Sequence, residues 1–258
     1  MKIPAGVLFD LDGVIYEGNS PIPGSVETLK KIRLAGIPCH FITNTTRMTK
    51  NNLVEYLGGI GFSVAPESVF SAPQAALEYC KLKGYKKISL VVPDPEMEQD
   101  FSSFQLVDIN PEAIVLGDMG QLFTFELLNR LFNEAINGSQ IIAMHKNRYW
   151  KSTQGLTIDL GTFIAALEYA SGKSAVVMGK PNSNMFLLAA QSWNVPPDSV
   201  FVIGDDIEGD ICGAKNAGMK SVLVKTGKFK EDVLARSKTM PDYIIESVAD
   251  LPSLLKLS

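Results

Sequence analysis

Short apolar runs along the chain alternate with longer segments that are apolar on one side only. The runs at 6–10 (GVLFD), 39–43 (CHFIT) and 199–206 (SVFVIGDD) predict strands, because a strand covered on both faces is apolar almost without interruption. The segments 25–36 and 49–61 predict amphipathic helices that stop at a glycine. Strands separated by helices are typical of βαβ units and parallel sheets.

The same alternation continues to the end of the chain. Further strands are predicted in KISLVVP, AIVLGD, QIIAM, SAVVMGK and KSVLVKTG, and further helices near 73–83, 122–137, 162–172, 183–193 and 208–217. These strands and helices are too many for one simple sheet, and the middle of the chain has a complete α/β series of its own. We therefore predict an α/β fold class: a doubly wound, parallel-sheet (Rossmann-like) core, residues 1–71 and 176–258, with an inserted α/β cap domain, residues 72–175.

Composition narrows the range of partners. The chain has 258 residues, of which 46% are hydrophobic, and a formal net charge of -4. No basic surface is indicated, so we expect neither a nucleic-acid nor a membrane partner. The N-terminus MKIPAG has no signal-peptide pattern. Cys39, Cys80 and Cys212 are far apart and lack a CxxC spacing, which favours free thiols and a cytoplasmic location.

Chemically active residues follow four of the predicted strands. Ligands of an open α/β sheet bind beyond the carboxyl ends of its strands, so residues at these ends share one edge. The four groups are Asp10-Leu11-Asp12-Gly13, Thr43-Asn44, Lys180, and Asp205-Asp206 with Asp210 at the start of the next helix. One acidic strand end is ordinary, but the set of four predicts a functional site.

The carboxylates of this set fit a magnesium site that also carries a nucleophile. Mg²⁺ prefers oxygen ligands and takes one or two protein carboxylates, which Asp10 and Asp205 can supply. A carboxylate can also attack phosphorus and form an aspartyl-phosphate. Asp12, two residues after Asp10, can protonate the leaving oxygen and later deprotonate water.

The remaining groups fit the oxygens of a phosphoryl group. Hydrogen-bond donors of the required kind are the Thr43 hydroxyl, the Lys180 ammonium, the backbone amide of Asn44 and the backbone amides around Leu11 to Gly13. A simpler interpretation of Thr43 and Asn44 is that they cap the next helix. Phosphoryl transfer is the chemistry that all four strand ends permit together.

Four segments resemble, in order, the motifs of the haloacid dehalogenase superfamily of aspartate-nucleophile phosphatases: FDLDGV, ITNTT, GKPN and GDDIEGD. The insertion between ITNTT and GKPN resembles the large α/β cap of the NagD-like subfamily. Within it, residues 145–170 are most similar to the haloacid dehalogenase-like hydrolase domain-containing proteins and to phospholysine phosphohistidine inorganic pyrophosphate phosphatase.

This resemblance implies a magnesium-dependent phosphatase that hydrolyses a small phosphorylated metabolite through an aspartyl-phosphate. The implied activity is that of a phosphoric monoester hydrolase, and the resemblance extends it to hydrolysis of pyrophosphate or phosphoamides. Dehalogenation is not predicted, because haloacid dehalogenases proper lack the second acid, Asp12. The resemblance also points to a homodimer formed through the cap.

The resemblance assigns roles to individual residues. Asp10 becomes the nucleophile and a metal ligand, and Asp12 the general acid and base, whose carbonyl also binds the metal. Asp205 completes the metal site. The other implied roles are phosphate binding by Thr43 and Asn44, charge neutralisation by Lys180, and support of the metal site by Asp206 and Asp210.

Other interpretations remain open at this point. A phospho-switch also combines an Asp pair, a Thr and a Lys, and a phosphate-binding protein with little turnover fits the same residues. Asp210 can equally be an acid that favours a helix N-terminus. In the insertion, HKNRYWK is either a solvated loop that begins at His145 or a segment that brings Arg148 or Tyr149 to the substrate. Arg47 either contacts an anionic substrate or lies in a solvated helix start.

Overall fold

The computed structural model describes residues 3–46, 48–152 and 155–257, so Arg47 lies outside the described residues. The chain divides into two compact units. The first consists of Met1–Thr43, Asn51–Phe70 and Lys180–Ser258, and the second of Asn44–Lys50 and Ser71–Gly179. The second unit thus takes in residues 44–50, 71 and 176–179, which the sequence prediction assigned to the core domain.

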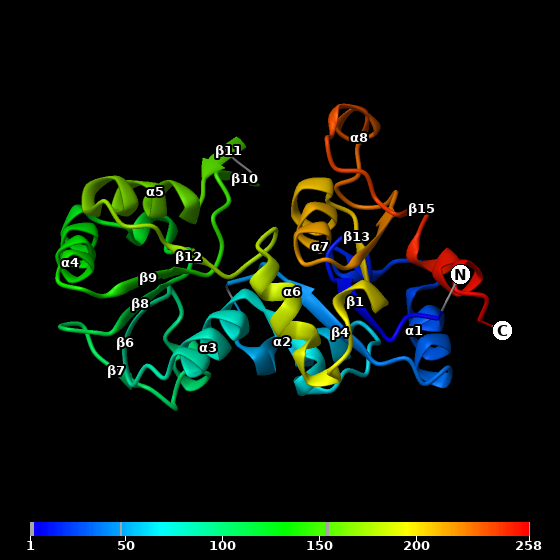
Figure 1. The fold of residues 1–258 in the computed structure, drawn as a ribbon, viewed down its shortest axis with the longest axis horizontal. Helices are drawn as coiled ribbons and strands as arrows, with labels where there is room; N and C mark the ends of the chain where they lie inside the picture. Colours follow the sequence, from blue (N-terminus) through cyan, green and yellow to red (C-terminus); the bar gives the residue numbers. More distant parts are fainter. Residues whose placement is uncertain (1–2, 47, 153–154, 258) are drawn as a thin grey trace. The chain divides into compact units, whose positions relative to one another are not determined.

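The first unit is built on a six-stranded sheet in the order β15-β14-β13-β1-β4-β5 (Figure 1). The pairings from β15 through β4 are parallel. The strands are β1 (Gly6–Asp10), β4 (Cys39–Thr43), β5 (Val69–Ser71), β13 (Val200–Gly204), β14 (Lys220–Val224) and β15 (Tyr243–Ile245). Every residue of β1 and β13 is buried, as expected for strands covered on both faces.

Helices cover this sheet and connect its strands. α6 packs against β1 and β4, α7 packs against β14, and α1 packs against α9. A short hairpin, β2 (Tyr16–Glu17) and β3 (Ser20–Pro21), follows β1. The helices are α1 (Ser25–Leu34), α2 (Lys50–Gly59), α6 (Ser183–Ala190), α7 (Cys212–Asn216), α8 (Glu231–Arg236) and α9 (Leu251–Leu254).

The strand register brings three of the four predicted strand ends to one edge. The strand before Lys180, β12 (Val176–Val177), belongs to the sheet of the second unit, so the prediction that all four strands share one sheet edge is wrong for that strand. Asp10 pairs with Ile42 of β4, and Phe9 pairs with Ile203 of β13. The carboxyl ends of these three neighbouring strands therefore lie side by side, which places Thr43 and Asp205 next to Asp10 in the sheet.

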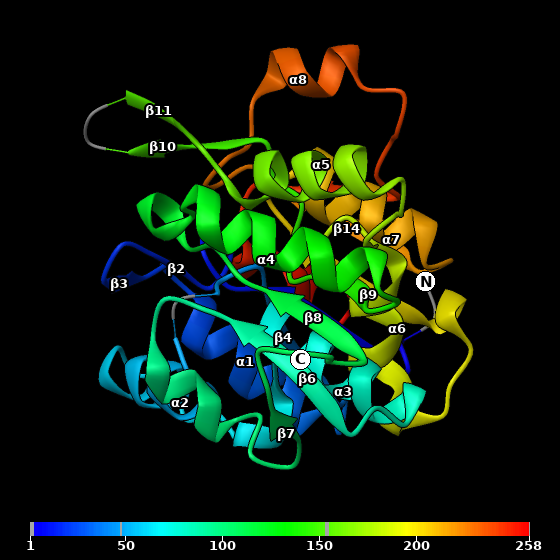
Figure 2. The same cartoon turned by 90° about the vertical axis from the view of Figure 1, so that its left-hand side faces the viewer.

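The second unit has its own five-stranded parallel sheet, in the order β12-β9-β8-β6-β7. α4 and α5 cover one face, and α3 lies on the other (Figure 2). The elements are α3 (Ala72–Lys83), α4 (Phe125–Ile136), α5 (Leu160–Ser171), β6 (Lys87–Val91), β7 (Gln105–Leu106), β8 (Ala113–Leu116), β9 (Gln140–Ala143) and β12 (Val176–Val177), with an antiparallel hairpin of β10 (Tyr149–Ser152) and β11 (Gly155–Ile158).

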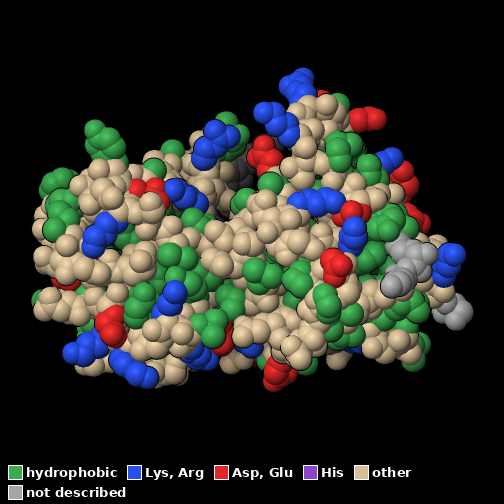
Figure 3. All heavy atoms as spheres, in the orientation of Figure 1, with side chains coloured by type: hydrophobic (Ala, Val, Ile, Leu, Met, Phe, Trp, Pro, Cys, Tyr) green, Lys and Arg blue, Asp and Glu red, His purple; other side chains and the backbone are tan. Residues whose placement is uncertain are grey.

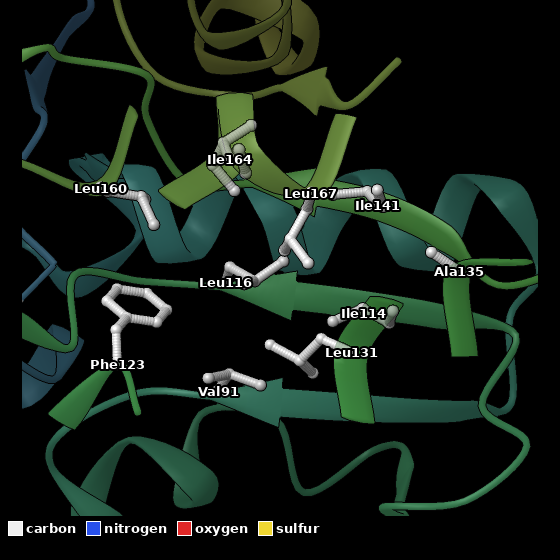
Figure 4. Close-up of a cluster of buried hydrophobic side chains, with 11 residues drawn as sticks. Val91, Ile114, Leu116, Phe123, Leu131, Ala135, Ile141, Leu160, Ile164 and Leu167 are labelled. Atoms are coloured by element: carbon white, nitrogen blue, oxygen red, sulfur yellow. The ribbon is translucent and has the colours of Figure 1, made fainter. Parts of the chain in front are cut away.

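An apolar core holds α4 and α5 on this sheet (Figure 4). Ile114 and Leu116 of β8 point towards Leu131 of α4 and Leu167 of α5. Burying a large apolar side chain contributes about 1.5–3 kcal/mol. The second unit therefore has a hydrophobic core of its own.

The structure confirms the α/β, Rossmann-like fold class, and it differs from the predicted elements in a few places. The predicted helix 208–217 begins as a π-helix, Ile207–Ile211, before α7. The hairpin β10–β11 and helix α8 were not predicted. Short 3-10 helices occupy Pro66–Ser68, Pro95–Gln99, Gly120–Leu122, Gln191–Trp193, Pro197–Ser199 and Val248–Asp250. Among the described residues, none of the helices combines the length and the apolar character that crossing a bilayer requires.

Candidate active site

Asp10 ends β1 and is 4% exposed. Its Oδ1 atom accepts a hydrogen bond from the Leu11 amide at 2.8 Å and lies 2.6 Å from Nζ of Lys180. A buried carboxylate needs such partners, because burial without them strongly disfavours the charged form. The side chain is thus held in a fixed position at the edge of the sheet.

Lys180 joins two buried carboxylates. Its ammonium lies 2.6 Å from Asp10 and 2.7 Å from Asp210, and its side chain is 7% exposed. Burial by itself lowers the pKa of a lysine, but the two neighbouring carboxylates outweigh it and raise the pKa of Lys180 above its ordinary value. Lys180 therefore stays charged in the site.

Asp205 follows β13 and is 1% exposed. Its Oδ2 atom accepts a hydrogen bond from the backbone amide of Lys228 at 2.6 Å. Its Oδ1 atom is buried and has no hydrogen-bond partner among the described residues. Burial, and next the charge of Asp10, raise the pKa of Asp205 to about 7.

Two glycines make room for the Asp205 carboxylate. A Cβ atom on Gly13 or on Gly227 would lie 2.0 Å from Asp205 Oδ2, and both residues have positive φ, 85° and 60°. Only glycine fits such a conformation at this distance. The loop after β1 and the loop after β14 therefore both close on Asp205.

Asp206 and Asp210 shape the turn that follows. The Asp206 side chain accepts hydrogen bonds from the amides of Glu208 and Gly209 at 2.9 and 3.0 Å, and so caps the π-helix. Asp210 is 0% exposed, and its Oδ2 atom accepts a hydrogen bond from the Asp206 amide at 3.2 Å. Burial, and then the Asp10 charge, raise the pKa of Asp210.

Three carboxylates of this site fit a divalent cation. Asp10, Asp205 and Asp210 each offer one oxygen, and these oxygens lie within 4.8 Å of one another. The unpartnered Oδ1 atom of Asp205 needs a donor or a cation. Both oxygens of Asp210 already have partners, Lys180 and the Asp206 amide. The structure thus suits Asp10 and Asp205 as ligands, and Asp210 as the support of Lys180.

Asp12 is exposed, unlike the three acids of this group. Although the residue is exposed, nearby protein partly desolvates its carboxyl group. This desolvation, and to a smaller extent the Asp10 charge, raise its pKa, while Lys228 is the largest influence that lowers it. A raised pKa is the direction that suits a general acid. The position of Asp12 is fixed by its loop, in which the Gly13 amide donates to the Tyr16 carbonyl at 2.7 Å.

The predicted phosphate-binding residues are placed less uniformly. Thr43 ends β4 beside Asp10 and is 8% exposed. Asn44 belongs to the second unit, where a Cβ on Gly179 would lie 2.6 Å from its Oδ1 atom. The Leu11 amide donates to Asp10 itself, and the Gly13 amide is engaged as described above. The roles of these residues towards phosphate stay predictions.

The sequence analysis missed the loop after β14. The Thr226 hydroxyl donates to the Gly13 carbonyl at 2.5 Å, and the Lys228 amide binds Asp205. The sequence does contain a pattern that could have indicated this loop. KSVLV is a further strand, in addition to the four considered, and the polar residues Lys-Thr-Gly-Lys follow it. Its residues are not acidic, and so the search for carboxylates passed over it.

In the second unit, residues 146–149 are exposed, as a solvated loop requires, but His145, at which the loop was predicted to begin, is buried. His145 is 4% exposed, its Nε2 atom lies 3.7 Å from Asp159, and its Nδ1 atom faces the Asn147 amide at 3.4 Å. Arg148 and Tyr149 are exposed. Their contact with a substrate stays a prediction.

Comparison with known proteins agrees with this architecture. Residues 7–106 match the family model described as haloacid dehalogenase-like hydrolase, and residues 177–251 match one described as HAD-hydrolase-like. The chain is 38% identical over 229 residues to haloacid dehalogenase-like hydrolase domain-containing protein 2 of Rattus norvegicus, covering 89% of this chain and 87% of the relative. It is 35% identical over 259 residues to phospholysine phosphohistidine inorganic pyrophosphate phosphatase of Xenopus laevis, covering 98% and 94%.

Among solved structures, a 4-nitrophenylphosphatase from Thermotoga maritima superimposes with a TM-score of 0.88 at 27% identity and covers 97% of both chains. The fold and the acidic strand-end site define a hydrolase with a Rossmann-like core. This chain belongs to the haloacid dehalogenase-like hydrolase family. The two relatives carry the names of the two branches that the sequence analysis placed nearest, which confirms that resemblance.

Proposed function

We propose that this chain is a magnesium-dependent phosphatase that hydrolyses small phosphorylated molecules through an aspartyl-phosphate on Asp10. The observation that carries the proposal is the buried group of Asp10, Lys180 and Asp205 at one sheet edge. The phosphatase names of the relatives support it. The same proposal includes residues 72–175 as a cap domain that determines substrate specificity.

In the first step, the Asp10 oxygen that does not face Lys180 attacks phosphorus, and the bond from phosphorus to the leaving oxygen breaks. Lys180 holds the other oxygen at 2.6 Å and thereby orients the carboxylate. Thr43, at the end of the adjacent strand, donates to a phosphoryl oxygen. A bound Mg²⁺, held by Asp10 and Asp205, would neutralise charge on the phosphoryl oxygens.

Asp12 moves the protons of both steps. Its pKa is raised, which is the direction that favours the protonated form, and in that form it donates to the leaving oxygen when the aspartyl-phosphate forms. The resulting carboxylate then takes a proton from the water that attacks phosphorus. The bond from phosphorus to the Asp10 oxygen breaks, which regenerates the Asp10 carboxylate and releases phosphate. Its exposure suits a group that must reach both the leaving group and water.

The test is a screen of purified protein over phosphate esters, phosphoamides and pyrophosphate with Mg²⁺. We expect many phosphates released per chain, no release with excess chelator, and a loss of at least about 1,000-fold in Asp10→Asn. An Asp232→Asn variant, changed in the exposed helix α8, serves as the matched control and should retain activity. One phosphate per chain would indicate a phospho-switch instead, and binding without release would indicate a phosphate-binding protein.

Two further expectations belong to this proposal. Exposed apolar side chains gather over α4 and α5 (Figure 3), and they include Phe125, Ile136 and Tyr169. They support a homodimer through the cap, which light scattering of Tyr169→Glu and the parent protein tests.

The three cysteines are free thiols, which supports a cytoplasmic location.

A further inference from the structure

The loop Thr226-Gly227-Lys228 is held rigidly against the acidic site. The Thr226 hydroxyl binds the Gly13 carbonyl, and the Lys228 amide binds Asp205. A Cβ on Gly227 would lie 2.6 Å from the Gly13 Cα atom, so the two loops touch backbone to backbone. The next residue, Phe229, packs on the apolar cluster of Ile207, Ile211 and Leu223. The backbone of Lys228 is therefore anchored on both sides.

The Lys228 side chain differs from that of Lys180 in its surroundings. Lys180 is enclosed between Asp10 and Asp210. The Lys228 side chain is 65% exposed, and its ammonium lies 3.9 Å from Asp206 Oδ2. At that distance the two groups attract each other without a direct hydrogen bond. Lys228 thus presents an exposed positive charge at the rim of a buried acidic group.

The loop that carries Lys228 also lies against the loop that carries Asp12. Thr226 binds the carbonyl of Gly13, the residue after Asp12, and the Lys228 amide binds Asp205, so the two loops meet over Asp205. Under the proposed function, Asp12 donates its proton to the leaving oxygen. A cation beside Asp12 and outside the phosphoryl pocket therefore lies next to the leaving group.

We propose that Lys228 selects substrates whose leaving group carries its own negative charge, such as a carboxylate or a second phosphate. The proposal rests on the proposed phosphatase function. Because the loop is rigid and the Lys228 ammonium is exposed, this ammonium attracts such a group directly. A neutral leaving group gains nothing from this contact and meets only Asp12.

A purely structural role of Lys228 leads to a different expectation. If the ammonium only offsets repulsion among the acids, its loss changes binding of every phosphate compound by the same factor. Selection of charged leaving groups instead changes the ratio between two compounds that differ by one carboxylate. The ratio, rather than the activity itself, is therefore the quantity to measure.

The experiment compares the parent protein with Lys228→Met and Lys228→Arg, with Lys225→Met as the matched control. Lys225 precedes the loop and pairs with Glu246 at 2.6 Å on the surface. Turnover is measured on phenyl phosphate and 4-carboxyphenyl phosphate. Equilibrium binding of methylphosphonate and phosphonoacetate with Mg²⁺ gives a second readout that needs no turnover.

We expect the parent protein to prefer the compound with the extra carboxylate in both assays. Lys228→Met should reduce this preference about fivefold to tenfold, while Lys228→Arg and Lys225→Met should keep it. The preference should also fall as salt is raised. An unchanged ratio in Lys228→Met, an equal loss for both compounds, or no preference in the parent protein would overturn the proposal. If the parent protein binds phosphonoacetate preferentially but hydrolyses nothing, the phosphatase proposal fails and the role of Lys228 stands.

Discussion

Removing the buried cation of the site should destabilise the first unit by several kcal/mol. In Lys180→Met the side chain keeps its approximate length, while Asp10 and Asp210 lose an ammonium at 2.6 and 2.7 Å. The two carboxylates are 4% and 0% exposed, so water cannot replace it. Breaking a buried ion pair from one side costs about 3–5 kcal/mol. A carboxyl group in the site can instead take up a proton. Relative to the unfolded chain, in which carboxyl pKa values are ordinary, this costs about 4 kcal/mol at pH 7 and limits the loss. We therefore expect about 3–4 kcal/mol.

The assay is urea unfolding at pH 7 with chelator, in a Trp150→Phe background. The chain has two tryptophans. The remaining one, Trp193, lies in the first unit with its ring centroid 4.6 Å from that of His40, so its fluorescence then reports this unit alone. Lys225→Met is the matched control, because it removes a contact of similar length at an exposed pair and should hardly move the midpoint. A loss in Lys180→Met no larger than in this control would refute the argument from burial.

Four other variants each change a single position. Asp12→Asn should slow both formation and breakdown of the phospho-enzyme by about 100-fold or more, measured by rapid quench; an unchanged rate of either step would remove Asp12 from that step. Burial alone would raise the pKa of Asp242, but hydrogen bonds from Lys215 and Ser221 lower it to about 2. Because this pKa is depressed, Asp242→Asn should cost about 1–2 kcal/mol at pH 7. The cost should shrink as pH falls from about 4 towards 2, and urea unfolding at pH 7 and pH 3 would contradict the estimate if the cost were equal at both. Gly161→Ala should destabilise the second unit by about 2–3 kcal/mol, because its Cβ would lie 2.4 Å from the Asn147 carbonyl oxygen. Gly58→Ala, in helix α2 with open space around it, should stabilise by about 0.5–1 kcal/mol, and thermal unfolding that gave both variants the same sign would refute the steric argument.

Most of the fold could be predicted from local pattern. β1 and β4 occupy the predicted residues, since an uninterrupted apolar run bounded by turn residues has few alternatives. The hairpin β10–β11 was missed because its two strands have four residues each and neither shows a clear period. The π-helix before α7 was missed for another reason. Asp206 caps it and Asp210 points into the site, and both are tertiary effects.

The acids of the site were predictable because they follow strands, and strand ends of one parallel sheet meet by geometry. Their individual partners were not predictable. The hydrogen bond from Thr226 to Gly13 joins residues 213 positions apart, and the pairing of Lys180 with Asp210 spans 30. No local pattern encodes which of several nearby acids a lysine will contact.

The sequence by itself thus determined the class of fold, the edge of the sheet where chemistry is possible, and the residue types available there, because strand periodicity and strand ends are local properties. Only the tertiary structure decided that one Asp205 oxygen has no hydrogen-bond partner among the described residues, that Asp210 contacts Lys180, that His145 is buried, and that the Lys228 side chain is exposed. These outcomes depend on which loops pack against each other, and that packing is set by contacts between segments far apart in the chain.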